Sequence, residues 1–365
     1  MKETNNFRNS LTIAGIIALS SVVTPIVAQE TVTSPVQQAI STQTYWTSDR
    51  KGAAQPMPLR TMSGSPSAAL AGILQSSGQS GSVNGNAPGK KAIVADQQSI
   101  VAPAFGAGST VWYSYPPPST LYVPILDYVV APLYPNTAVG KLYFNIGASR
   151  YVCSAQSVTS AGDWGVGNRQ TVVTAGHCCS DSSGFFSNWL FEPAHFNGAA
   201  PLGSWTASTA TVLNSWYQNE DMSRDVCVLQ MNTLNGKNIN DAVGALGYAY
   251  NQPLPQHYHA TGWPAAAPFN GGMLYISTAS DAETDTNAAG DFPYTHGIGN
   301  LMTGGSSGGA WIRQFQPLVG VNQFNGLNSY KYIVPNRPAE MFGPYIDDVI
   351  IFNLLQVVAT SPAAP

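Results

Sequence analysis

The sequence has few charged residues and no cluster of charges of one sign. Lys, Arg, Asp and Glu make up 9% of the 365 residues, against roughly 25% in an ordinary globular domain. The formal net charge is −4, and no run of like charges occurs. Nucleic acids and anionic membranes require a basic surface, so neither is expected as a partner. The sequence also lacks an Asn-x-Ser/Thr acceptor, and N-glycosylation is not expected.

Long apolar segments are equally scarce, because only one occurs, at the N-terminus. Residues 1–28 begin with Lys2 and Arg8, continue through an apolar region from Leu11 to Val27, and end at Ala28. This order is typical of a secretory signal peptide. A membrane anchor is the alternative, although the apolar run is barely long enough to cross a hydrocarbon core of ~30 Å. We therefore predict a secreted, extracellular protein that has no membrane contact once the signal is removed.

Cysteine is rare and confined to one part of the chain. The four cysteines are Cys153, Cys178, Cys179 and Cys227. In an exported protein they favour two disulfides, for which three pairings are possible. A metal site is the alternative, but the adjacent pair Cys178-Cys179 does not match the ligand spacing of zinc sites, and no metal is expected.

Residues 29–123 show little periodic apolar pattern. They are rich in Ser, Gly, Gln, Pro and Ala, and segments such as Gln75–Pro88 are predicted to be flexible because they can bury little surface. For an exported enzyme, such a stretch would be a propeptide or a flexible linker. An extension without a specific role is the alternative, and composition does not separate the two.

From about Pro124 the pattern changes to short apolar runs separated by turns. Four Asn-Gly pairs, starting at positions 197, 235, 270 and 325, mark turns. One helix is predicted, over residues 343–357, where apolar residues recur every three or four positions. Many short strands favour an all-β sandwich or a pair of barrels. The predicted strands are Lys141–Ile146, Tyr151–Val158, Thr171–Thr174, Ala210–Leu213, Val226–Met231, Met273–Thr278, Gly309–Ile312, Leu318–Val321 and Tyr330–Val334.

Two motifs carry the chemistry. The first, Thr-Ala-Gly-His-Cys, places His177 at the end of an apolar run, and the second, Gly-Gly-Ser-Ser-Gly-Gly, encloses Ser307 between glycines. A reactive serine needs a base and backbone N–H groups that stabilise an oxyanion. An α/β-hydrolase would need a histidine after the serine, but the last histidine is His296. A subtilisin-like chain would need Asp before His and alternating strands and helices.

The remaining order is His, Asp, Ser, as in chymotrypsin. Asp225 is the best candidate for the acid, because it directly precedes the apolar run Val226–Met231. The nearest rival is Asp221, which lies in a polar loop. His177, Asp225 and Ser307 are therefore the predicted catalytic residues of a serine hydrolase.

These motifs resemble those of chymotrypsin-fold serine proteases, and within them the secreted V8-like, or glutamyl-endopeptidase-like, branch. The resemblance covers about residues 134–325 and includes Pro135–Leu142, Tyr151–Ser154 and Thr261–Pro264. It implies two antiparallel six-stranded β-barrels, at approximately 124–245 and 246–342, followed by the C-terminal helix. It thus implies a trypsin-like serine protease domain over residues 124–365.

The resemblance also implies a role for each site residue. Ser307 would be the nucleophile, His177 the general base and then acid, and Asp225 the group that orients the imidazole. The N–H groups of Gly305 and Ser307 would form the oxyanion hole. The enzyme would cleave protein or peptide substrates through an acyl-enzyme, with no cofactor. The family's histidine-loop disulfide would correspond to Cys153–Cys178, which leaves Cys179 and Cys227 for a sterically plausible second bridge.

The sequence gives weaker signals for substrate preference and for activation. The resemblance places Leu301, Met302, Asn322 and Gln323 in the primary substrate pocket, where no charge favours Lys, Arg or Glu. An apolar or small side chain is therefore predicted. Ser306 replaces the Asp that receives the new N-terminus in many relatives, so a zymogen would be activated by another route.

Three other histidines have competing interpretations. His296 is predicted to be a surface or loop residue, although it could serve an acidic substrate. His257 and His259 would share a face of a strand but lack a third metal ligand. We predict a monomeric endopeptidase. The alternatives are an inactive homologue that acts as a binding protein, and an esterase on the same fold.

Overall fold

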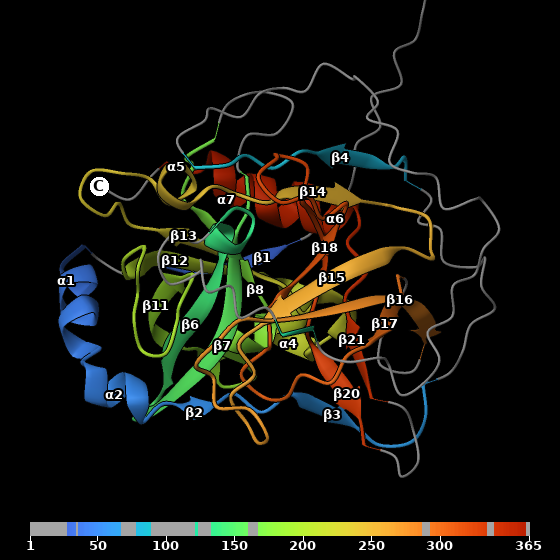
Figure 1. The fold of residues 1–365 in the computed structure, drawn as a ribbon, viewed down its shortest axis with the longest axis horizontal. Helices are drawn as coiled ribbons and strands as arrows, with labels where there is room; N and C mark the ends of the chain where they lie inside the picture. The colour runs from blue at the N-terminus through green and yellow to red at the C-terminus, as the bar shows by residue number, and fades with distance from the viewer. Residues whose placement is uncertain are drawn as a thin grey trace, which may run out of the picture.

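The computed structural model describes residues 28–33, 36–66, 78–88, 121–122, 133–159, 167–286, 293–333 and 339–362. The predicted signal peptide lies outside these ranges except for Ala28. Most of the regular structure in these ranges is β-sheet (Figure 1). The two halves of the sheet system share an apolar core. None of the helices in the described ranges is long and apolar enough to cross a membrane.

The first barrel is a closed ring of six antiparallel strands. Its strands follow the order β12-β11-β6-β7-β8-β13, and β12 pairs again with β13 to close the ring. A short hairpin, β9 (Ser180–Asp181) and β10 (Gly184–Phe185), lies between β8 and β11. The barrel strands are β6 (Val139–Ile146), β7 (Ser149–Ser157), β8 (Thr171–Thr174), β11 (Ser187–Pro193), β12 (Trp205–Leu213) and β13 (Cys227–Met231).

The second barrel closes through one stretch of chain that serves as two strands. The hydrogen-bonded path runs β20-β21-β17-β16-β15-β18-β19, and only Asn328 and Ser329 separate β19 from β20. Residues 323–332 therefore pair with β18 at one end and with β21 at the other. The strands are β15 (His257–Gly262), β16 (Tyr275–Asp285), β17 (Thr295–Gly299), β18 (Ala310–Arg313), β19 (Gln323–Leu327), β20 (Tyr330–Tyr332) and β21 (Glu340–Gly343).

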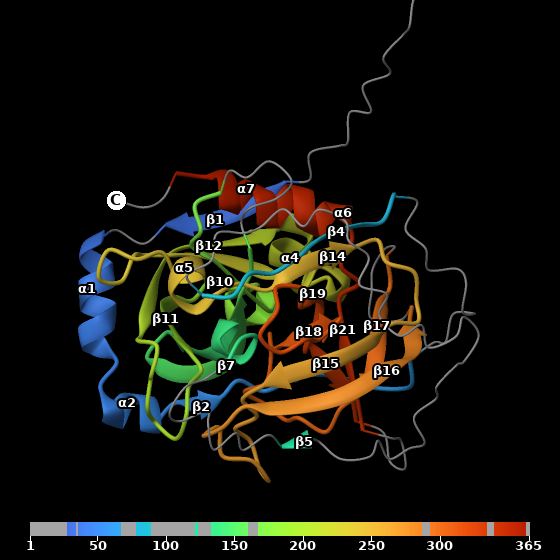
Figure 2. The ribbon, with the colours of Figure 1, turned by 45° about the horizontal axis from the view of Figure 1, so that its top comes forward.

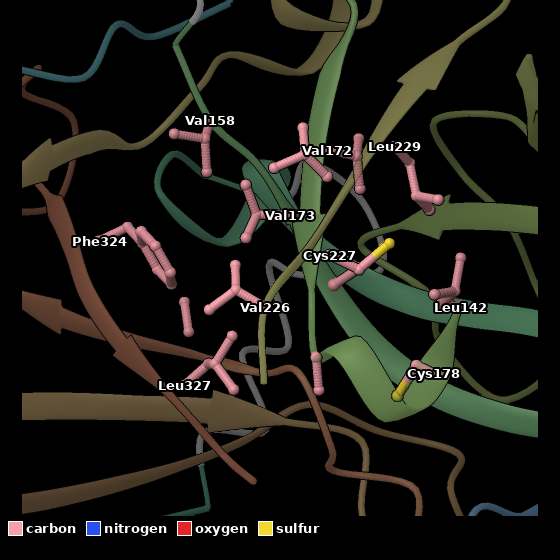
Figure 3. Packing of buried hydrophobic residues seen from close by; sticks show 14 of the residues in the cluster. Leu142, Val158, Val172, Val173, Cys178, Val226, Cys227, Leu229, Phe324 and Leu327 are labelled. Atoms are coloured by element: carbon pink, nitrogen blue, oxygen red, sulfur yellow. The ribbon is translucent and has the colours of Figure 1, made fainter. Parts of the chain in front are cut away.

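The core is continuous from one barrel to the other. Figure 3 shows Val158, Val173 and Val226 of the first barrel beside Phe324 and Leu327 of the second. All five are buried, and burying each such side chain contributes roughly 1.5–3 kcal/mol. The barrels therefore pack as one unit, and the predicted all-β, two-barrel fold is confirmed.

The C-terminal helix forms, but with shifted ends. It begins at α6 (Asp348–Ile350), passes through a π-helical turn (Ile351–Leu355), and ends with α7 (Gln356–Thr360). The carboxylate of Asp347 caps it by accepting a hydrogen bond from the N–H of Ile350 at 3.0 Å. Residues 343–347 precede the helix, because the cap at Asp347 determines its start.

Two expectations about local structure are wrong. The sequence favoured a single helix, but four more form within the described residues: α1 (Val36–Tyr45), α2 (Ser48–Gly52), α4 (Asn214–Asn219) and α5 (Ile239–Val243). None has a clear apolar period, and tertiary packing favours them instead. The expected strand Leu318–Val321 is a turn, in which Leu318 has a φ of 69° and is 61% exposed.

Parts of the N-terminal region are ordered on the barrels. β1 (Gln29–Thr33) pairs with β12, and β4 (Gly81–Val83) pairs with β14 (Gly247–Tyr250), as Figure 2 shows. The expected flexibility of Gln75–Pro88 is thus wrong for residues 78–88. Strand addition uses backbone groups and needs little apolar side-chain pattern, which is why composition did not indicate it. β5 (Leu121–Tyr122) pairs with β16 in the same way.

Candidate active site

His177 lies at the exit of β8 in a tight helical turn, Gly176–Cys178. Gly176 permits a close approach to Trp216, since a Cβ at this position would lie 2.8 Å from the indole ring. The centroid of the His177 ring is 6.4 Å from that of Trp216. The indole therefore lies along one side of the imidazole.

Asp225 holds His177 through two hydrogen bonds. The His177 N–H donates to Oδ1 of Asp225 at 2.8 Å, and Nδ1 of His177 lies 2.8 Å from Oδ2. Ser329 adds a third bond, its hydroxyl donating to Oδ2 at 2.5 Å. All three residues are buried. Oδ2 thus joins the base of the first barrel to a residue of the second.

The electrostatics keep Asp225 ionised. Burial alone would raise the pKa of this carboxyl. The positive charge of a protonated His177 lowers the pKa of Asp225. Hydrogen bonds from the His177 side chain, Ser329 and the His177 backbone lower it further. The net result is a pKa below the ordinary value of Asp. A charged carboxylate fixes the Nδ1–H tautomer and leaves Nε2 available as a proton acceptor.

Glycines on both sides of Ser307 allow its loop to pack against the first barrel. Gly305 and Gly308 have φ values of 93° and 80°. A Cβ at Gly308 would lie 2.2 Å from Oγ1 of Thr174, so only glycine fits there. The carbonyl of Ser307 accepts a hydrogen bond from the Ser154 N–H at 2.8 Å. The loop is therefore bound to β7 and β8 beside the His177 turn.

Two polar atoms at this point are buried without a hydrogen-bond partner among the described residues. They are Nε2 of His177 and Oγ of Ser307. Buried polar atoms usually have partners, and the exceptions here are the atoms that a proton transfer from serine to histidine would join. The bond between them is not made in this state; such bonds often tighten only when substrate is bound.

Two disulfides support the His177 turn. Cys153 is bonded to Cys178, which is the pairing that the resemblance implied, and Cys179 is bonded to Cys227. The first bond ties the turn to β7 and the second ties it to β13. The sulfurs of Cys153 and Cys178 also lie within 4.8 Å of a ring nitrogen of His177. Sulfurs in a disulfide are not thiolates, so this group does not form a metal site.

The structure brings Leu301 and Met302 near the serine loop but places Asn322 and Gln323 elsewhere. Leu301 is 39% exposed and Met302 is fully buried. The Asn322 side chain instead bonds backbone atoms of Gln316 and Val319, and Gln323 donates to Asn84 at 3.0 Å. The assignment of Leu301, Met302, Asn322 and Gln323 to the pocket stays a prediction, although Asn322 precedes β19 and its side chain is engaged in the turn before that strand.

Asn328 and Lys331, two residues that the sequence did not single out, are hydrogen-bonded close to the serine loop. The amide of Asn328 donates to the carbonyl of Ser306 at 3.0 Å, and its oxygen accepts from Asn300 and Trp311. Nζ of Lys331 donates to the Asn300 carbonyl at 2.8 Å, and burial lowers the pKa of this lysine to about 8.

The remaining histidines lie away from the triad candidates. His296 is not a surface or loop residue, because it is buried on β17 with Nδ1 2.6 Å from Oδ1 of Asp281. His257 and His259 have ring centroids 5.9 Å apart. Burial and the neighbouring His257 lower the pKa of His259 to about 4. Within the described ranges, no third metal-ligating side chain joins this pair.

Two packed β-barrels, with His, Asp and Ser where they meet, define a chymotrypsin-like hydrolase. The family model described as Trypsin matches residues 144–340, and the chain belongs to this family. It is a serine endopeptidase by class. None of the curated proteins matches the sequence.

Two solved structures illustrate the similarity. Protease Anisep from Arthrobacter nicotinovorans is 37% identical with a TM-score of 0.53, and the match covers 62% of this chain and 97% of that chain. The thermostable serine protease AL20 from an extremophilic microorganism is 35% identical with a TM-score of 0.54, and the match covers 62% and 99% of the two chains. The matched portion corresponds to the size of a complete protease domain.

Proposed function

We propose that the chain is a secreted endopeptidase that hydrolyses peptide bonds with Ser307, His177 and Asp225 as its catalytic triad. The observation that carries the proposal is the buried pair of hydrogen bonds between His177 and Asp225, which leaves Nε2 of His177 available beside the Ser307 loop. A serine hydroxyl is a weak nucleophile until such a base removes its proton.

The reaction would proceed in two halves. Oγ of Ser307 attacks the peptide carbonyl carbon while its proton passes to Nε2 of His177. His177 then protonates the amide nitrogen, the C–N bond breaks, and an acyl-enzyme remains. Water then attacks the acyl-enzyme while its proton passes to His177. His177 returns the proton to Oγ of Ser307, the ester bond breaks, and the carboxylic acid is released. The N–H groups of Gly305 and Ser307 would stabilise the oxyanion, each donor contributing about 3–4 kcal/mol in comparable sites.

The domain boundaries and the localisation belong to the same proposal. Residues 1–28 would be the signal peptide, 29–123 a propeptide or linker, and 124–365 the protease domain. Two disulfides support an oxidising compartment, since such bonds persist mainly in exported proteins. The apolar environment of Met302, at full burial, supports an apolar or small substrate side chain in the primary pocket.

A fluorophosphonate probe with peptide mapping tests the nucleophile. Both the full chain and any processed form should be labelled at Ser307, and Ser307→Ala should lose labelling and peptidase activity by about 10⁶-fold. The matched control is Ser306→Ala, whose hydroxyl only donates to the Thr303 carbonyl at 2.8 Å and which should remain labelled. Labelling that persists in Ser307→Ala contradicts the assignment, and a folded, mature wild type that never reacts supports a binding protein.

A further inference from the structure

A short N-terminal segment, residues 55–62, crosses the candidate active site; we call it the strap. It begins at β2 (Gln55–Pro56), which pairs in parallel with Tyr151 and Val152 of β7. It ends at β3 (Arg60–Met62), which pairs in parallel with β20. Figure 1 shows β2 beside β7 and β3 beside β20. The strap thus passes from the first barrel to the second over the place where the barrels meet.

The centre of the strap contacts the serine loop through its backbone. The carbonyl oxygen of Met57 accepts a hydrogen bond from the Gly305 N–H at 3.0 Å. A Cβ at Gly304 would lie 2.8 Å from the same oxygen and 3.5 Å from Cα of Pro58. Gly305 is one of the two proposed oxyanion donors. The backbone carbonyl of Met57 is therefore bound to the N–H group that a substrate carbonyl would need.

The next side chain of the strap covers the pocket region. Leu59 packs against an apolar cluster that includes Met302, Ile298 and Met341. Met302 is the fully buried residue that lies five positions before Ser307. The strap therefore contributes one apolar side chain in the region where the primary substrate side chain is expected.

Arg60 fastens the strap on the side of His177. Its guanidinium donates to Glu220 at 2.8 Å and lies 5.7 Å above the centroid of the Trp216 ring. Trp216 is the indole that packs beside His177. With these contacts in place, His177 and Ser307 have no exposed surface. A substrate cannot reach a site that is covered in this way.

We propose that the strap is an autoinhibitory segment that keeps this protein inactive until it leaves the cleft, an inference that rests on the proposed function. Pro56 and Pro58 fix φ on both sides of Met57 and hold the strap extended, which lowers the entropy cost of docking. The strap is part of the same chain, so even modest contacts keep it bound.

The docked strap is placed as an inhibitor and not as a substrate. The carbonyl that contacts Gly305 belongs to the Met57–Pro58 bond, whose nitrogen carries no hydrogen. At the same time the Ser307 hydroxyl is not hydrogen-bonded to Nε2 of His177. Activation would consist of releasing the strap, by cleavage of the chain or by displacement, which frees the Gly305 N–H and the surface around Met302.

The test compares the rate of fluorophosphonate labelling in full-length chains. The double substitution Leu59→Asp with Arg60→Glu places a carboxylate in the apolar cluster and opposes Glu220. It should speed the labelling of Ser307 about tenfold or more by shifting the population of chains with an open cleft. The matched control is Ile40→Asp, on the N-terminal helix α1 outside the strap and 61% exposed, which should label at the wild-type rate.

A peptide supplied in trans makes the test independent of folding effects. A synthetic peptide with the sequence of residues 52–64 should slow labelling of the double variant. The same peptide carrying both substitutions should not. If circular dichroism shows that the double variant is unfolded, Arg60→Gln replaces it, with an expected increase of about threefold from loss of a half-exposed ion pair.

The outcomes separate this inference from the proposed function. Equal labelling rates in the wild type and the released variant, with no inhibition by the peptide, would overturn the strap and leave the triad intact. If no folded form, released or not, is labelled at Ser307, the proposed function fails and the strap inhibits nothing. Faster labelling of the released variant, reversed by the peptide, supports both.

Discussion

The two barrels hold their shares of the active site by different means. The first carries His177 and Asp225 and contains all four cysteines, paired as two disulfides around the His177 turn. The second carries the Ser307 loop and has no cysteine. There, buried polar side chains bond one another, as Asn328 does with Asn300 and Trp311. Disulfides support the turn that carries His177, whereas hydrogen bonds between buried side chains lie behind the loop that carries Ser307.

This difference has an energetic consequence. A disulfide acts mainly on the unfolded chain and tolerates small shifts of its surroundings. A buried hydrogen bond contributes little net stability when made, but an unmatched partner costs about 1–3 kcal/mol. We therefore expect single substitutions in the second barrel to disturb the site locally, and loss of a disulfide in the first to lower global stability.

The largest effect should come from the acid that joins the barrels. Asp225→Asn removes the negative charge and favours the wrong tautomer of His177, and kcat should fall roughly 10⁴-fold. The measurement is peptide hydrolysis at pH 7 with folding checked by circular dichroism. Asp221→Asn is the matched control, because the carboxylate of Asp221 accepts hydrogen bonds only from the N–H and hydroxyl of Ser223, at 2.9 and 2.8 Å. An equal loss in the control would contradict the choice of Asp225.

Much of this site was predictable, because its signals are local. The apolar run before His177 and the glycines around Ser307 show their function within a few residues. Their order along the chain, with Asp225 between them, excluded other hydrolase folds before any contact was known. Five of the six strands of the first barrel followed from short apolar runs such as Thr171–Thr174, whereas β11 was not predicted.

What was missed depends on contacts between distant segments. Ser329 has no motif around it, and its role appears only when β20 brings its hydroxyl to Asp225, 104 residues earlier in the chain. The strap binds through backbone groups and one leucine, so its composition resembles a linker. The prediction for Leu318–Val321 was wrong in another way: its apolar residues indicated a strand where the structure has a turn. Apolar residues also occur in exposed turns.

The second largest effect should come from the disulfide Cys179–Cys227. Replacing both cysteines by alanine should lower the free energy of unfolding by about 4 kcal/mol, the loop-entropy value for the sequence separation of 48 residues. Urea unfolding measures this loss, and adding a reductant to the wild type should reproduce it. A loss below ~1 kcal/mol would contradict the idea that covalent bonds stabilise the first barrel.

The corresponding test in the second barrel is Asn328→Ala. It leaves Trp311 Nε1 and the Asn300 amide without their shared acceptor in a buried site, and should cost roughly 2–3 kcal/mol. Urea unfolding again gives the value. Asn232→Ala is the matched control: this half-buried amide bonds only Thr206 and should cost under ~1 kcal/mol. Equal costs would show that the network has no special importance.

The smallest effect should come from Ser329, a positioning residue that acts through Asp225. Ser329→Ala removes one donor to Oδ2, so kcat should fall about tenfold, equivalent to ~1.4 kcal/mol, while KM stays within twofold of the wild type. The remaining carboxylate binds a proton more readily, because hydrogen bonds to its charged form had lowered the pKa of Asp225. The acid limb of the pH–rate profile should therefore move to higher pH. A profile that keeps its acid limb, or a loss confined to KM, would place Ser329 in substrate binding and break the link between the barrels that its hydroxyl provides.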